Sequence, residues 1–187
     1  MKRRQLVTCA VMTLILATGA AFAEDKVQSD EPLTAAAGFE RMIALEGVWE
    51  GESVNVPVGK SMDEGVKSST KVIYETIANN TSVVATYGKD TPMEMVSLFH
   101  MDGPETLVHT HYCAVGNQPS MKYVPSENPN EIVLKFSGGT NMDVNKDGHV
   151  HDSTIRFKED GSIETETNIW NEGKHSYTRY ATLTRVE

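Results

Sequence analysis

From residue 48 to the carboxyl terminus, the sequence consists of short segments in which apolar and polar residues alternate. Segments such as TSVVATY (81–87) and EIVLKF (131–136) have the length and the β-branched and aromatic content of strands. Turn-forming sequences such as Gly88-Lys89-Asp90 and Asp160-Gly161 separate them. No stretch has the spacing of a strand–helix–strand unit, so we expect neighbouring strands to pair in antiparallel fashion.

The alternation predicts an all-β fold, an antiparallel up-and-down barrel of about eight to ten strands, because closure removes the exposed edges of the sheet. A loop rich in glycine, serine and lysine is expected between the first two strands. The expected strands span residues 48–54, 71–77, 81–87, 93–101, 106–113, 120–124, 131–136, 149–157, 162–170 and 175–186.

One short helix is expected before the strands. In TAAAGFERMIALEG (34–47), Phe39, Met42 and Ile43 recur at helical spacing, and Gly47 can end the helix. The mostly polar residues 24–37 are expected to form a flexible lead-in, and residues 38–187 a single barrel domain.

The first 23 residues predict export. Lys2, Arg3 and Arg4 precede an apolar run, and Ala21-Phe22-Ala23 matches a signal-peptidase cleavage site. The run is too short to span a membrane, and no stop-transfer pattern follows it. We therefore expect residues 1–23 to be removed as a signal peptide, and the mature protein to be periplasmic or extracellular.

The charge of the chain and its distribution argue against two classes of partner. The sequence has 17 Lys and Arg against 26 Asp and Glu, a net charge of -9 at pH 7. Cleavage after Ala23 would remove basic residues and make the protein more acidic still. Nucleic-acid binding needs clustered cations, and a membrane surface needs a basic amphipathic helix, so neither partner is expected.

Two motifs carry resemblances to known families. Gly47-Val48-Trp49, after a short helix, resembles the opening of the lipocalin and fatty-acid-binding (calycin) barrels. This resemblance implies that Trp49 closes the floor of the barrel under a basic residue of the last strand, either Arg179 or Arg185. HYCAVGNQP (111–119), with TNMDVNKDGHVH (140–151), resembles a group of uncharacterised exported bacterial proteins of lipocalin-like fold. That resemblance implies a fold and no activity.

Histidines occupy alternate positions in two of the expected strands. His109, His111 and Cys113 share one face of 106–113, and we favour that face as the inner one. His149 and His151 should also point inward, because mostly polar and charged residues fill the other face of 149–157.

Reversal of consecutive strands would bring both groups to one rim of the barrel, together with the loops that follow and precede them. We therefore expect a ligand-binding pocket lined by His109, His111, Cys113, Asn117, Gln118, His149 and His151.

Several chemistries are compatible with this rim. We favour a small-molecule-binding protein whose ligand is a small apolar or amphipathic molecule. The alternative is a hydrolase- or isomerase-type enzyme that uses the histidines directly or through a metal such as zinc, held by His111, His149 and His151. A second alternative is protein interaction through the rim loops.

No catalytic residue is assigned. Cys113 as a nucleophile would need an adjacent base and a residue to orient that base, so a buried, inert thiol is favoured. Asp143-x-Asn145-x-Asp147 matches the first half of a calcium loop, but Thr154 stands where such loops carry glutamate, which favours an ordinary turn.

Overall fold

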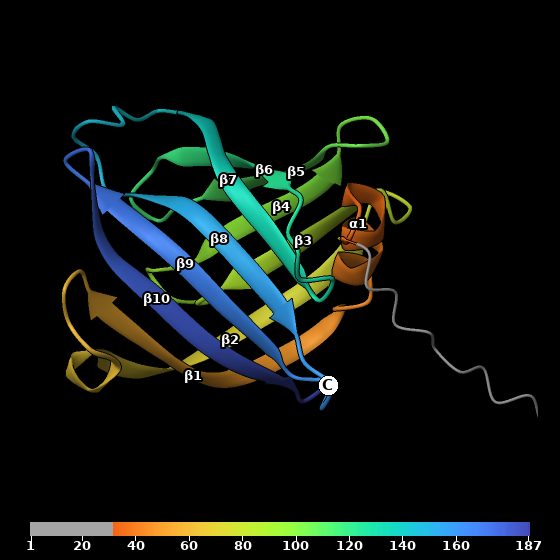
Figure 1. Ribbon diagram of the computed structural model, residues 1–187, viewed down its shortest axis with the longest axis horizontal. Helices are drawn as coiled ribbons and strands as arrows, with labels where there is room; N and C mark the ends of the chain where they lie inside the picture. The colour runs from red at the N-terminus through yellow and green to blue at the C-terminus, as the bar shows by residue number, and fades with distance from the viewer. Residues whose placement is uncertain (1–31) are drawn as a thin grey trace, which may run out of the picture.

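The computed structural model describes residues 32–187, so the expected signal peptide lies outside the described residues. Within this range the chain forms a closed barrel of ten antiparallel strands preceded by one α-helix, which confirms the predicted fold class (Figure 1). Each strand pairs with its neighbours in sequence, and β1 pairs with β10 to close the barrel. The elements are α1 (Ala35–Ile43), β1 (Gly47–Pro57), the short 3-10 helix η1 (Met62–Glu64), β2 (Val66–Ile77), β3 (Ser82–Tyr87), β4 (Met95–Met101), β5 (Leu107–Tyr112), β6 (Gln118–Val124), β7 (Glu131–Thr140), β8 (His149–Phe157), β9 (Ile163–Asn171) and β10 (Lys174–Arg185).

The first two strands are longer than the sequence predicts. Much of the expected loop belongs to the β1–β2 ladder, where Ser69 pairs with Glu52 and Val66 with Asn55. Serine and lysine have weak strand preference, and pairing with a neighbouring strand overrides it.

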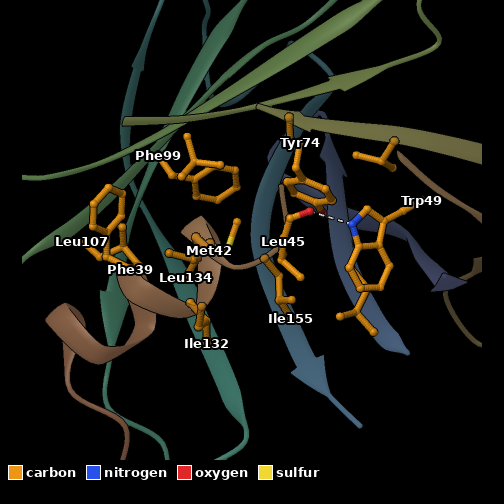
Figure 2. Packing of buried hydrophobic residues seen from close by; sticks show 14 of the residues in the cluster. Phe39, Met42, Leu45, Trp49, Tyr74, Phe99, Leu107, Ile132, Leu134 and Ile155 are labelled. Atoms are coloured by element: carbon orange, nitrogen blue, oxygen red, sulfur yellow. Dashed lines mark hydrogen bonds between the residues drawn. The ribbon is translucent and has the colours of Figure 1, made fainter. Parts of the chain in front are cut away.

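Helix α1 closes one end of the barrel (Figure 1). Its amino terminus is capped by Thr34, whose hydroxyl accepts a hydrogen bond from the Ala37 amide at 3.1 Å. Phe39 and Met42 are buried in the core, where Figure 2 shows them beside Leu134. Because the helix begins at Ala35, the end of the expected lead-in 24–37 is part of the folded domain.

Trp49 lies in the barrel floor next to α1. Its indole nitrogen donates a hydrogen bond to the Leu45 carbonyl at 2.7 Å (Figure 2), and its ring meets Tyr74 edge to face. The Arg185 guanidinium lies 4.9 Å from the centre of the indole ring and donates to the carbonyls of Ala44 and Glu46. The basic residue over Trp49 is therefore Arg185, which leaves Arg179 for another role.

The barrel interior is divided into two halves. The half next to α1 is apolar, because inward side chains such as Leu107, Ile132 and Leu183 pack there with the helix. The other half is lined by serine, tyrosine and histidine side chains. It extends to the end of the barrel at which β5 ends and β8 begins. We call that end of the barrel the far end. No helix among residues 32–187 is long and apolar enough to cross a membrane.

Candidate functional site

His109 and His111, the inner pair, lie on the inner face of β5. Both are buried with Leu107, whereas Tyr112, on the other face of the strand, is 47% exposed. This confirms the orientation favoured from the sequence.

His109 is a buried imidazole without hydrogen-bond partners. Its ring stacks on Phe99, its cross-strand neighbour on β4, with 4.4 Å between ring centres and 5° between the ring planes. The residue is 4% exposed, and neither ring nitrogen has a partner among the described residues. Burial lowers the pKa of His109 to about 3, and the neighbouring His111 adds to this effect. The ring is therefore neutral at physiological pH and presents one unmet donor and one unmet acceptor.

His111 lies one pleat further toward the far end. Its Nδ1 is hydrogen-bonded to the hydroxyl of buried Ser97 at 3.0 Å, and its ring meets Tyr87 edge to face at 6.2 Å. Burial lowers its pKa to about 4, and burial also raises the pKa of Tyr87. Strands β3, β4 and β5 thus form a continuous polar patch on the inner wall.

Cys113 follows β5 as a half-buried free thiol. Its Sγ faces the thioether of Met95 at 3.9 Å. A thioether is no base, so this contact does not activate the thiol. The sequence favoured a buried thiol, and Cys113 is only half-buried; its inert role stays a prediction.

The two loops at the far end are joined by hydrogen bonds. Asn117 is buried and donates through Nδ2 to the Gly148 carbonyl at 2.8 Å. Gln118 accepts a hydrogen bond from the Thr140 hydroxyl at 3.0 Å, and Asn141 donates to the Gly116 carbonyl at 2.7 Å. The expected convergence of these loops is present, and Asn117 and Gln118 connect them.

The aspartates of the β7–β8 loop are engaged within the loop. The Asp147 carboxylate accepts from the Asp143 amide at 2.7 Å, and the Asp143 carboxylate binds the Lys146 ammonium at 2.9 Å. This is the ordinary turn that the sequence favoured over a calcium loop.

The register of β8 with β9 places His149 and His151, the outer pair, on the outer face of the strand, where His149 is nevertheless buried. On β9, Asn168 pairs with Asp152, whose carboxylate binds the exposed Lys135 outside the barrel. Trp170 comes two residues after Asn168 and shares this outer face. His149 pairs with Trp170, and the ring of His151 stacks on Trp170 at 3.9 Å.

A β-bulge explains why the expected inward orientation is not found. The register of β8 against β9 shifts between Val150 and Asp152, which leaves His151 without a partner on β9. One extra residue reverses the alternation of side chains beyond the bulge. Val150 therefore packs against the core in the place expected for the histidines.

The outer pair forms a hydrogen-bonded chain. The Asp147 carbonyl can only accept, so His149 donates to it from Nδ1 at 2.8 Å. Nε2 of His149 is hydrogen-bonded in turn to Nδ1 of His151, at 3.1 Å. The His151 ring lies between Trp170 and Phe136, whose ring centre is 4.5 Å away. Phe136 pairs with buried Met121 on β6 and follows the last β7–β8 pair, so its ring meets the outer pair where β7 and β8 diverge (Figure 1).

The histidines therefore form two pairs on opposite faces of the wall, and they do not surround one shared cavity. Among residues 32–187, no group of three or more His, Cys, Asp or Glu side chains is placed to hold a metal ion. Zinc binding by His111, His149 and His151 stays a prediction, and so does the role of the far-end residues in ligand binding.

Arg179 is an inner-face residue whose place in the site the sequence reasoning missed. It alternates with Ala181 and Leu183, both buried, and its Nη2 donates to the Thr70 hydroxyl on β2 at 3.2 Å. Burial lowers the pKa of Arg179, while the phenols of Tyr177 and Tyr87 act in the opposite direction. Its even spacing from Leu183 is the signal that places this cation inside the barrel.

A recess of about 450 Å³ lies on the outer surface, away from the inner pair, and is lined in part by Phe157. Its Arg156 already binds Glu131 at 3.0 Å and Glu166 at 2.9 Å. Because the Arg156 guanidinium is already paired with two carboxylates, the recess offers fewer free hydrogen-bonding groups to a ligand than the barrel interior.

Comparisons with known proteins supply no function. No family model and no curated protein matches the chain. Among solved structures, the chain is similar to a protein of unknown function from the DUF3598 family of Nostoc punctiforme, with 13% sequence identity and a TM-score of 0.46. The similarity covers 88% of this chain and 53% of that chain, so this chain spans about half the length of the protein it matches.

Proposed function

We propose that the protein binds a small, partly apolar molecule inside the barrel, in the half away from α1. The observation that carries the proposal is His109, a buried imidazole with no partner for either ring nitrogen among residues 32–187. Most buried polar groups in proteins are hydrogen-bonded, and an unsatisfied one costs about 1–3 kcal/mol. A ligand that supplies the missing donor or acceptor would recover this cost.

The surroundings of His109 suit such a ligand. Phe99 and the His109 ring stacked on it form an aromatic pair, and Tyr87, Ser97 and His111 add hydroxyl and imidazole groups on the same wall. Apolar surface with a few placed polar groups is the usual composition of small-molecule sites.

Binding fits these histidines better than acid–base catalysis. A general base works best when its pKa lies near the working pH. The pKa values of about 3 for His109 and about 4 for His111 lie well below neutrality, because both rings are buried. Neutral imidazoles act instead as fixed hydrogen-bonding groups. We extend the proposal to location: the protein binds its ligand outside the cytoplasm, after removal of residues 1–23.

The test is titration with N-phenyl-1-naphthylamine, a neutral aromatic probe that fluoresces in apolar surroundings. We expect saturable binding to the wild type and loss of binding in Ser97→Phe, because the new ring occupies the space beside His111. The matched control is Ser69→Phe, which places the same ring on the exposed outer face of β2. It should bind like the wild type.

Unchanged binding in folded Ser97→Phe, or no saturable binding in the wild type, would contradict the proposal. If Ser97→Phe does not fold, Ser97→Val tests the same position with a smaller side chain. Native mass spectrometry of protein purified from its own host, with elemental analysis, would identify a retained ligand or metal directly.

A further inference from the structure

Arg179 projects into the barrel on the side opposite the inner pair. In the order of strands around the barrel, β10 and β5 are five positions apart in either direction, so they face one another. The guanidinium reaches past β1, where Gly51 has no side chain, to the Thr70 hydroxyl on β2. The cation is therefore held against the inner wall of the polar half.

No carboxylate is paired with Arg179 among the described residues. The acidic side chains of the flanking strands point outward, where Glu50 binds Lys71 at 2.9 Å and Glu166 binds Arg156 at 2.9 Å. A guanidinium has five N–H groups, and the Thr70 hydroxyl accepts from one of them. A partly buried cation without a counter-ion is costly, and an anion bound beside it would offset that cost.

A second unsatisfied group lies on the neighbouring strand. The backbone of Asn55 on β1 pairs with that of Arg179, and the Asn55 side-chain oxygen is buried without a partner in the part of the chain that the structure describes. Amide oxygen and nitrogen positions can be exchanged, so this position can also present a donor. Two inward polar positions on adjacent strands thus have unused hydrogen-bonding capacity in the polar half of the barrel.

The charge of the site selects the kind of anion. His109 and His111 are neutral at physiological pH and add no charge to the interior. One guanidinium balances one negative charge, and its planar fork matches the two oxygens of a carboxylate. A phosphate monoester, which is close to a dianion at neutral pH, would leave an excess negative charge in the barrel.

We propose that Arg179 binds the carboxylate of a monoanionic ligand whose apolar part lies between β10 and the inner pair. This inference rests on the proposed binding function and specifies its ligand as an amphipathic carboxylate. The Thr70 hydroxyl holds the guanidinium in place, and Asn55 offers a polar side chain nearer the far end.

The experiment compares three ligands that share one ring system: 2-naphthoate, the neutral 2-naphthamide and 2-naphthyl phosphate. Calorimetric titration of the wild type should rank naphthoate first. Arg179→Gln should weaken naphthoate binding by about 10- to 100-fold, the usual loss for a charge-assisted hydrogen bond, and leave naphthamide nearly unchanged. The control Lys71→Gln removes a cation from the outer face of β2 and should alter none of the three affinities.

The outcomes separate this inference from the proposed function. Equal affinity of the wild type for naphthoate and naphthamide, or a naphthoate affinity unchanged in Arg179→Gln, would overturn the carboxylate site while leaving ligand binding intact. Preference for the phosphate would overturn the monoanion argument. Absence of binding by all three ligands would count against both proposals. If Arg179→Gln does not fold, Arg179→Lys keeps the charge but loses the fork, and it should still reduce the preference for naphthoate over naphthamide.

Discussion

At the scale of single residues, the inner wall combines good packing with unmet hydrogen bonding. The His109 ring stacks on Phe99 as an apolar ring would, yet its two nitrogens have no partners among the described residues. Such a residue lowers stability, and its position in the interior suits ligand binding. Natural proteins often have lower stability at a binding site because the site needs polar groups that only the ligand satisfies.

The first prediction concerns the stability that His109 costs the folded protein. His109→Phe should raise the free energy of unfolding at pH 7 by about 1–3 kcal/mol, because it removes buried unsatisfied polar atoms and keeps the stacked ring. Urea denaturation measures the change. Tyr112→Phe, at an exposed position of the same strand, is the control and should shift stability by no more than about 0.5 kcal/mol. A destabilised His109→Phe would show that the imidazole nitrogens have partners in solution.

The second prediction concerns pH. The pKa values of His109 and His111 are lowered to about 3 and about 4 by burial, whereas the unfolded chain binds these protons near the ordinary value of 6.5. Below about pH 6.5 the unfolded state therefore holds more protons, and stability falls as the pH drops toward the folded-state values. Each histidine should cost about 2 kcal/mol between pH 7 and pH 5.

Urea denaturation at both pH values tests this expectation. The difference between wild type and His109→Phe isolates one histidine from all other titrating groups. If both proteins lose the same stability between pH 7 and pH 5, the pKa of His109 is not lowered.

At the scale of elements, the bulge in β8 separates the two histidine pairs. Without the extra residue between Val150 and Asp152, alternation would place His149 and His151 on the inner face with Ile155. With it, the outer pair packs between Phe136 and Trp170 and strengthens the wall where β7 leaves β8. The histidines of β8 thus pack as part of the wall, whereas His109 of β5 keeps its hydrogen-bonding groups unsatisfied.

The third prediction follows from this separation. His151→Ala should lower the free energy of unfolding by about 1–3 kcal/mol, because it removes a ring stacked on two aromatic neighbours. It should leave the affinity for N-phenyl-1-naphthylamine unchanged, because the residue lies on the outer face. Denaturation and probe titration on the same sample measure both quantities. Weaker probe binding by a folded variant would place His151 in the ligand site, as the sequence alone suggested.

The fourth prediction concerns the joint between α1 and the barrel. Trp49→Ala should destabilise the protein by about 3–5 kcal/mol, because the indole is buried, bonded to Leu45 and covered by Arg185. Thermal denaturation measures the loss. Tyr112→Ala, at an exposed site on β5, should have a far smaller effect, and similar losses for both would argue against a floor built on Trp49.

At the scale of the whole molecule, closure and asymmetry are the main features. Pairing of β1 with β10 removes every sheet edge from the described barrel, which limits edge-to-edge aggregation. Helix α1 fills one end with apolar side chains, and the polar groups lie toward the other. A molecule held between them would place its apolar part toward the core and its polar part among the inner pair and Arg179.

The fifth prediction also belongs to the whole chain. The basic, apolar and Ala21-Phe22-Ala23 segments predict that the exported protein begins at Glu24. Mass spectrometry of protein recovered from the periplasm or the medium measures its amino terminus. An Ala23→Asp variant, which alters the cleavage site, should accumulate uncleaved chain. Recovery of wild type that still carries residues 1–23 would refute the signal peptide.

The sequence by itself determined those features that depend on local periodicity. Alternation over a few residues is enough to identify ten strands, the turns between them and the inward face of His109 and His111, because side-chain direction follows directly from the backbone of an unbroken strand. The short helix could be predicted in the same way from the spacing of its apolar residues. The buried position of Trp49 was predicted through a resemblance.

Only the tertiary structure decided the features that depend on register between strands. The bulge that turns His149 and His151 outward has no distinct signal in β8 itself, because it exists only relative to the pairing with β9. Arg179 and Arg185 both alternate with buried leucine on one strand, and their opposite roles follow from what lies across the barrel: α1 and Trp49 at one end, Thr70 and the polar half at the other. Contacts between residues far apart in the chain set these positions, and local sequence does not encode such contacts.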